Sequence, residues 1–163
     1  GYILHSTLHA GIAEAHAIMH THTTAGVAVA SLASGLSQSN FYSAQLHNMV
    51  ATHEFEGITV HADEGPRLLQ SIGNKRAVIL KNHGLVSWAG TLPQAFAILW
   101  TLQRACEIQL KAQATGQPMI PIHSAILAGI RAQASEVTKQ AGGALAWPGI
   151  KRRVERRFPG FDA

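Results

Sequence analysis

Short apolar runs that close on polar residues recur along this chain. Two of them, Ala17–His22 and Val78–His83, begin with aliphatic side chains and end with histidine. Runs of this length, bounded by polar and glycine positions, are typical of partly or fully buried β-strands. Glu56–His61 and Gly84–Trp88 have the same character. The pattern therefore predicts four short strands.

A long helix with one apolar stripe is predicted after the last of these runs. Apolar side chains recur every three or four positions from Ala95 to Leu110. Thr91 is placed to cap this helix, Pro93 suits its first turn and Gly116 ends it. Shorter helices are predicted at His5–Ile12, Ala25–Leu32, Arg67–Ile72 and Ser124–Gln140.

Capping and loop signals lie between these elements. Ser6 is placed to cap the first short helix, and Thr23 or Thr24 the second. The segment Ser34–Ser43 is rich in Ser, Gly and Asn, and predicts a loop. Strands and helices mixed in this way predict a layered α/β domain.

Composition bounds the class of protein. A chain of 163 residues with 47% hydrophobic content is enough for one domain with a real core, so we expect a single domain over residues 1–163. The one cysteine, Cys106, excludes an internal disulfide and favours a cytoplasmic location. The sequence shows neither an apolar run long enough to cross a membrane nor the pattern of a signal peptide.

The net charge of +4 is concentrated near the carboxyl end. Five of the thirteen basic residues lie within Lys151–Arg157. A basic segment of this kind could meet phosphates, but no aromatic residues are interleaved for stacking on bases. We therefore expect a solvated helix or arm there and no nucleic-acid partner.

Histidines supply the candidate chemistry. In a strand, alternate side chains share a face, so His20 and His22 are expected to point the same way. Neutral imidazole is a common zinc ligand, and His83, at the end of another predicted strand, is the best third ligand. By contrast, His47, His53 and His61 are expected to be surface or hydrogen-bonded histidines.

The combination of "HTHTTAGVAVAS" with a later "VILKNHGLVSWAGTLPQAF" resembles the class II aldolase/adducin family. The resemblance extends to "GYILHSTLH", "HEFEGITV" and "ACEIQLKAQA". The sequence of these segments is more similar to the adducin-like branch than to the sugar-phosphate aldolases. It implies a three-layer α/β/α sandwich around a mixed, mostly antiparallel sheet. It also implies that His20, His22 and His83 hold Zn²⁺ or a similar divalent transition metal.

Further properties follow from the resemblance. Family members usually form homo-oligomers, and the aldolase branch acts on small hydroxy-carbonyl molecules with the ion as Lewis acid. The chain begins inside what the family would make a motif, so we expect that it lacks the family's N-terminal portion.

One position departs from the aldolase pattern. The aldolases carry an acid/base glutamate four residues ahead of a histidine. When that histidine is matched to His5 by its spacing to His20, the glutamate position falls on Gly1, which cannot transfer a proton. If His9 is matched instead, His5 takes the glutamate position and could serve as base or as a fourth metal ligand, but the spacing to His20 is then several residues too short, so the first match is favoured. In either case His5, or a residue outside this pattern, is expected to handle protons, and His5 is the candidate catalytic residue in this chain.

Two functional classes remain open on the sequence. The first is a metal-dependent lyase or epimerase that acts on a small hydroxy-carbonyl compound. The second is an adducin-like module that binds other proteins and has lost the chemistry. The three metal-type histidines favour the first class, and Gly1 favours the second.

Overall fold

The computed structural model of the protein describes residues 1–58, 63–139 and 141–161. Its centre is a four-stranded sheet formed by β1 (Ala17–Thr21), β2 (Val50–His53), β3 (Ala77–Leu80) and β4 (Gly84–Ala89). The strand order is β1-β4-β3-β2. Strand β4 runs antiparallel to both neighbours, whereas β2 and β3 are parallel. Strands β1, β2 and β3 therefore share one direction, and their carboxyl ends lie at the same edge of the sheet.

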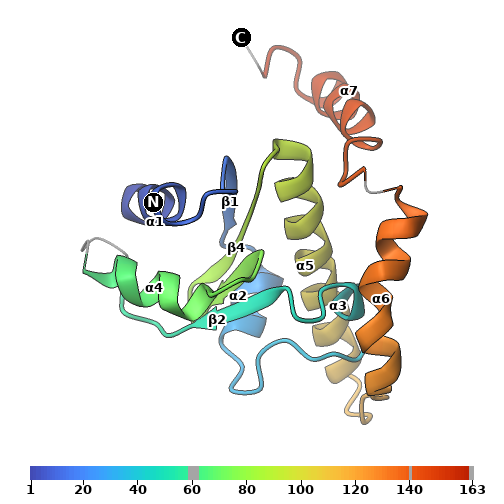
Figure 1. The fold of residues 1–163 in the computed structure, drawn as a ribbon. Coiled ribbons are helices and arrows are strands. Elements are labelled where there is room, and N and C mark those ends of the chain that lie inside the picture. Colours follow the sequence, from blue (N-terminus) through green and yellow to red (C-terminus); the bar gives the residue numbers. More distant parts are fainter. Residues whose placement is uncertain (59–62, 140, 162–163) are drawn as a thin grey trace.

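Helices cover both faces of this sheet (Figure 1). The helices are α1 (Tyr2–Gly11), α2 (Thr24–Ala30), α3 (Phe41–Gln45), α4 (Glu64–Ile72), α5 (Leu92–Gln113), α6 (Ser124–Val137) and α7 (Trp147–Arg157). Helices α1 and α4 lie on one face, and α2 and α5 on the other. The architecture is the three-layer α/β/α sandwich around a mixed, mostly antiparallel sheet that the resemblance implied.

Alternation along the strands divides the core in two. Val78 and Val86 face the α1/α4 layer, where they pack with Leu4, Leu8, Leu68 and Ile72. Their sequence neighbours Ile79 and Leu85 face the opposite layer, where they pack with Val29 of α2 and Leu102 of α5. Because both faces are covered, every residue of β3 and β4 is buried, and all but Ser87 are apolar.

Several predicted boundaries are confirmed by their caps. Thr23 accepts a hydrogen bond from the backbone N–H of Gly26 at the start of α2, and Thr91 accepts one from Gln94 at the start of α5. Strand β1 begins at the predicted residue and ends one residue early, at Thr21.

Four predictions need correction. The predicted strand 78–83 ends at Leu80, because residues 81–83 form the turn to β4. Ser6 does not cap α1, because the helix begins at Tyr2 and the Ser6 hydroxyl donates to the Ile3 carbonyl within it. The predicted loop 34–43 ends at Asn40, whose side chain forms a capping box for α3. The predicted strand 56–61 is wrong over residues 56–58, which form no strand, and its remaining residues lie outside the described ones. Strand β2 lies earlier in the chain.

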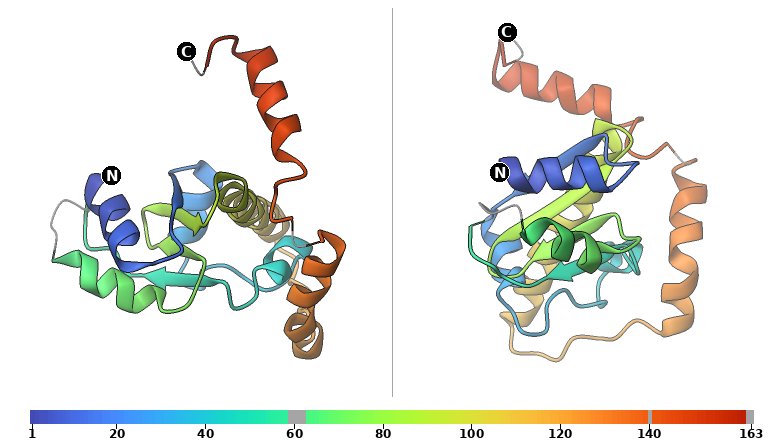
Figure 2. Two further views of the ribbon diagram at one scale, coloured as in Figure 1. Left: turned by 45° about the horizontal axis from the view of Figure 1, so that its top comes forward. Right: turned by 60° about the vertical axis from the view of Figure 1, so that its left-hand side comes forward.

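The carboxyl-terminal helices extend away from the sandwich (Figure 2). Helix α6 contacts α3, and none of the residues of α7 is buried. Cys106, by contrast, is fully buried in α5, and burial raises the pKa of its thiol to about 12. Among the described residues, no helix is both long enough and apolar enough to cross a membrane.

Candidate metal centre at one edge of the sheet

The end of β1 positions two of the predicted ligands. His20 pairs with Val86 of β4, so its side chain lies on the α1/α4 face. His22 follows the strand and is not part of it. The chain then turns into α2, and the two imidazoles still meet, with their Nε2 atoms 2.7 Å apart.

The third ligand lies on the tight turn between β3 and β4. Asn82 adopts a left-handed conformation with φ of 54°, which Asn tolerates better than most residues, and its N–H donates to the Ala30 carbonyl. The His83 N–H donates to the Leu80 carbonyl, which closes the turn. At Gly84 an added Cβ would lie 2.4 Å from the Thr21 backbone oxygen, so the absent side chain allows β4 to approach β1.

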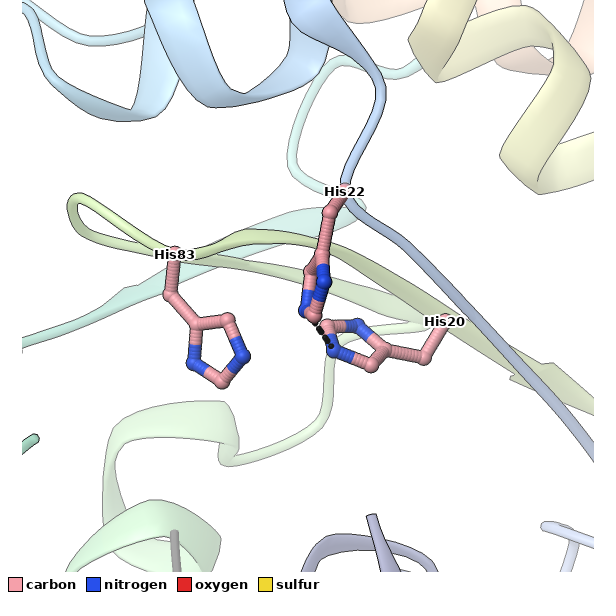
Figure 3. A group of neighbouring side chains, drawn as sticks. All are labelled: His20, His22 and His83. Carbon is pink, nitrogen blue, oxygen red and sulfur yellow. Dashed lines mark hydrogen bonds between the residues drawn. The ribbon is translucent and has the colours of Figure 1, made fainter. Parts of the chain in front are cut away.

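These segments bring the three imidazoles together (Figure 3). We call His20, His22 and His83 the histidine cluster. The ring centroids lie 4.5 Å apart for His20 and His22, 5.0 Å for His20 and His83, and 4.8 Å for His22 and His83. One ligand nitrogen from each ring lies within 4.8 Å of the other two. Among the described residues, this is the group of side chains that could hold a metal ion.

The electrostatics of the histidine cluster suit a metal. The pKa of His20 is lowered to about 4, chiefly by burial and also by the charges of His22 and His83, while a hydrogen bond to the Leu85 carbonyl opposes the shift. Burial also lowers the pKa of His83. Both rings are therefore neutral near pH 7, as metal ligation requires.

Hydrogen bonding fixes the tautomer of His20. Its Nδ1 lies 3.0 Å from the Leu85 carbonyl oxygen and can only donate to it. The proton on Nδ1 leaves Nε2 with a lone pair directed into the histidine cluster. A ligand imidazole oriented by a backbone carbonyl through its other nitrogen is the usual arrangement in metal sites. The residues present therefore fit a divalent ion.

His5 lies in α1, which packs on the face of the sheet that carries the His20 side chain. Its charge is the smallest of the causes that lower the pKa of His20. Burial, followed by the charge of His9, lowers the pKa of His5 itself. His9 lies apart from this group, with its Nδ1 2.6 Å from the Ala15 carbonyl oxygen.

Two groups beside the histidine cluster were missed on the sequence. Glu64 begins α4 and is only 7% exposed. Its negative charge raises the pKa of His83 against the effect of burial. His53 ends β2, is 3% exposed and lies 3.7 Å from Glu64, measured between Nε2 and Oε1. Of the two, only His53 had a sequence signal, because it closes a short run that contains apolar residues, as the histidines of the cluster do.

Comparison with known proteins identifies the family. A family model described as Class II Aldolase and Adducin N-terminal domain matches residues 1–110. The chain belongs to the class II aldolase/adducin family. Within this family, a Pseudomonas aeruginosa protein whose name proposes a class 2 aldolase is 36% identical over 164 residues, which cover 99% of this chain and 63% of the relative.

Solved structures of class II aldolase proteins share the fold. The crystal structure of an aldolase II superfamily protein from Pseudomonas syringae matches 97% of this chain and 63% of that chain, with a TM-score of 0.89 and 33% identity. An L-fuculose 1-phosphate aldolase from Glaciozyma antarctica matches 82% of this chain and 50% of that chain, with a TM-score of 0.70 and 31% identity. The chain thus spans less than two thirds of the length of these relatives.

Proposed function

We propose that this protein binds a divalent transition metal ion, first of all zinc, through His20, His22 and His83, and acts as a lyase or epimerase on a small hydroxy-carbonyl compound. The observation that carries the proposal is the convergence of three imidazoles from two segments of the chain at one sheet edge. The similarity to an L-fuculose 1-phosphate aldolase supports it.

The donor set suits catalysis better than structural support. Three protein nitrogens leave a zinc ion an open coordination position, and such an ion supplies a Lewis acid for a substrate carbonyl. The chain's own residues prepare that site. The Leu85 carbonyl orients the His20 ring, and burial keeps His20 and His83 unprotonated.

His5 is the proposed base of the reaction. A base at neutral pH must be unprotonated before substrate binds, and burial lowers the pKa of His5 in that direction. Helix α1 covers the face of the sheet that carries His20, and the charge of His5 is felt by the His20 ring. Gly1 has no side chain and cannot accept the proton.

Metal analysis tests the proposal. Protein purified without chelators and then loaded with zinc should retain about one equivalent per chain, because three neutral imidazoles are preassembled. His20→Ala should lose most of it. His47→Ala is the matched control, since His47 is not in the histidine cluster and its ring is hydrogen-bonded to the Gln38 side chain. Wild-type protein that retains less than about a tenth of an equivalent would overturn the proposal.

The alternative is an adducin-like binding module without catalysis. Gly1 at the place of the aldolase glutamate favours it. Metal retention alone does not separate the two functions, but turnover of any hydroxy-carbonyl substrate by metal-loaded protein would exclude the non-catalytic module. We also propose a cytoplasmic location, which the single free Cys106 favours, and a homo-oligomeric state.

A further inference from the structure

The segment 54–56 follows β2 at the edge of the sheet that carries the histidine cluster. Its outer two residues each pair with a different part of the fold. Glu54 pairs with Lys81 on the turn between β3 and β4, at 2.5 Å. Glu56 accepts hydrogen bonds on both carboxylate oxygens from Nε of Arg67 in α4, at 2.9 and 3.0 Å. Exposed ion pairs add little stability, but two of them, one on each side, fix the position of the residue between.

Phe55 is that residue, and its ring lies beside the histidine cluster. The ring centroids of Phe55 and His83 are 6.5 Å apart and their planes meet at 84°, which is the edge-on arrangement that aromatic pairs favour. The residue remains 51% exposed. The open part of the Phe55 ring therefore offers apolar contact area to a molecule bound at the histidine cluster.

Positive charge at this edge is already paired with carboxylates. The described segments that meet here are α1, α2, α4, residues 54–58 and the turn 81–83, and their lysines and arginines are Lys81 and Arg67. Each of the two pairs with a glutamate. A phosphate group would have to compete with these glutamates for a cation and would be repelled by their charge. An uncharged group meets neither obstacle.

We propose that Phe55 contacts the substrate of the histidine cluster and selects a hydroxy-carbonyl compound that carries an aromatic or other apolar group in place of a phosphate. This inference rests on the proposed function and adds the substrate class to it. The hydroxy-carbonyl end binds at the histidine cluster, and the apolar group packs on the exposed part of the Phe55 ring. Removal of both apolar surfaces from water provides the selectivity.

Three hydroxamates that bind zinc through the same group test the substrate class. Acetohydroxamate carries a methyl group, benzohydroxamate a phenyl ring and phosphonoacetohydroxamate a charged phosphonate. In calorimetry, zinc-loaded wild-type protein should bind benzohydroxamate roughly two- to tenfold more tightly than acetohydroxamate, which is the usual contribution of one aromatic pair. Phosphonoacetohydroxamate should bind no more tightly than acetohydroxamate.

Variants of Phe55 test its contact with the ligand. Phe55→Ala should abolish the preference for benzohydroxamate and leave zinc content and acetohydroxamate affinity unchanged, because the ring contacts only the apolar group. Phe55→Leu should keep part of the preference. Phe161→Ala is the matched control and should behave as the wild type, since Phe161 follows α7 and is 50% exposed.

Contact between the two rings also has a direct readout. In NMR spectra of zinc-loaded protein with labelled phenylalanine, the phenyl protons of benzohydroxamate should show a nuclear Overhauser effect to one Phe ring. This effect should be lost in Phe55→Ala and kept in Phe161→Ala. An effect that persists in Phe55→Ala would assign the contact to another ring and overturn the proposal.

The possible failures are distinguishable. Wild-type protein that retains zinc but binds benzohydroxamate no more tightly than acetohydroxamate would overturn this inference and leave the metal site standing. Tightest binding of phosphonoacetohydroxamate would overturn it as well, in favour of an anionic substrate. An unchanged preference in Phe55→Ala would remove Phe55 from the site. Wild-type protein that retains no zinc would overturn the proposed function, and this inference with it.

Discussion

Burial, together with repulsion from neighbouring imidazoles, lowers the pKa of His20 and of His83 in the folded chain. The pKa of His20 falls from 6.5 to about 4, chiefly through burial. The unfolded chain keeps the higher value and therefore binds more protons between these limits. This neutral ring adds stability that is fully present above the unfolded pKa and is lost as pH falls toward the folded one. The lowered pKa values of His5 and His83 act in the same direction.

Metal-free protein should therefore lose stability toward urea as the pH falls from about 7 to about 5. His20→Asn should flatten this dependence, because the variant has no ring to protonate. His47→Asn should leave it unchanged. Equal slopes for wild-type protein and His20→Asn would show that burial of His20 does not govern the acid sensitivity.

Individual residues also show how much of the site the sequence predicts. The histidine cluster was predicted because each member closes an apolar run, and strand ends bring such residues to a sheet edge. Glu64 was not predicted, because a glutamate in the first turn of a helix is ordinary on dipole grounds alone. His53 looked like a loose histidine, since Glu64 approaches it only through the packing of α4 on the sheet.

At the scale of elements, β4 can pack closely against β1 because Gly84 has no side chain. A Cβ at position 84 would meet the Thr21 backbone oxygen at 2.4 Å and the His22 ring at 3.1 Å. Gly84→Ala should push the two strands apart and destabilise the fold by about 1–3 kcal/mol. Because His22 moves with β1, zinc affinity should also fall, by roughly tenfold or more.

Gly129→Ala is the matched control for this change. Gly129 lies within α6, where an added Cβ meets nothing within 4 Å. Alanine there should stabilise the helix by about 0.5–1 kcal/mol and leave zinc affinity unchanged. Urea unfolding and zinc titration measure both effects. Wild-type zinc affinity in Gly84→Ala would contradict the proposed coupling.

The strands were predicted unevenly, for a physical reason. Strands β3 and β4 are apolar on both faces and stand out from their surroundings. Strand β2 has four residues, one of them an exposed Thr52, and its pairing with β3 determines its position. Segment 56–61 shows the clearer alternation in sequence, and that misled the prediction. Strand order depends on contacts between distant segments, which local patterns do not contain.

At the scale of the whole molecule, the outer side of α5 exposes an aromatic surface. The ring of Trp100 lies 5.6 Å from that of Tyr42, which in turn lies 5.4 Å from the exposed Phe41. A groove of about 660 Å³ between α5 and α7 adjoins it and includes Trp100, Ile150 and Val154. Exposed apolar surface of this extent is typical of subunit contacts.

Light scattering should therefore show a homodimer or homotetramer at micromolar concentration. Trp100→Ser should weaken the assembly, because it removes the centre of the aromatic surface. Ile120→Ser should not, although Ile120 is also highly exposed, because it lies on the segment between α5 and α6. A wild-type monomer would contradict the proposed homo-oligomer.

The burial of Cys106 determines when its thiol can be alkylated or oxidised. Its thiol lies inside α5, with a pKa of about 12, so at neutral pH it is almost never a thiolate. Alkylating agents and peroxides then react with it only after α5 has left the sheet. Modification of this single sulfur would record how often the layer opens. It would carry no information about the metal site proposed on the other face.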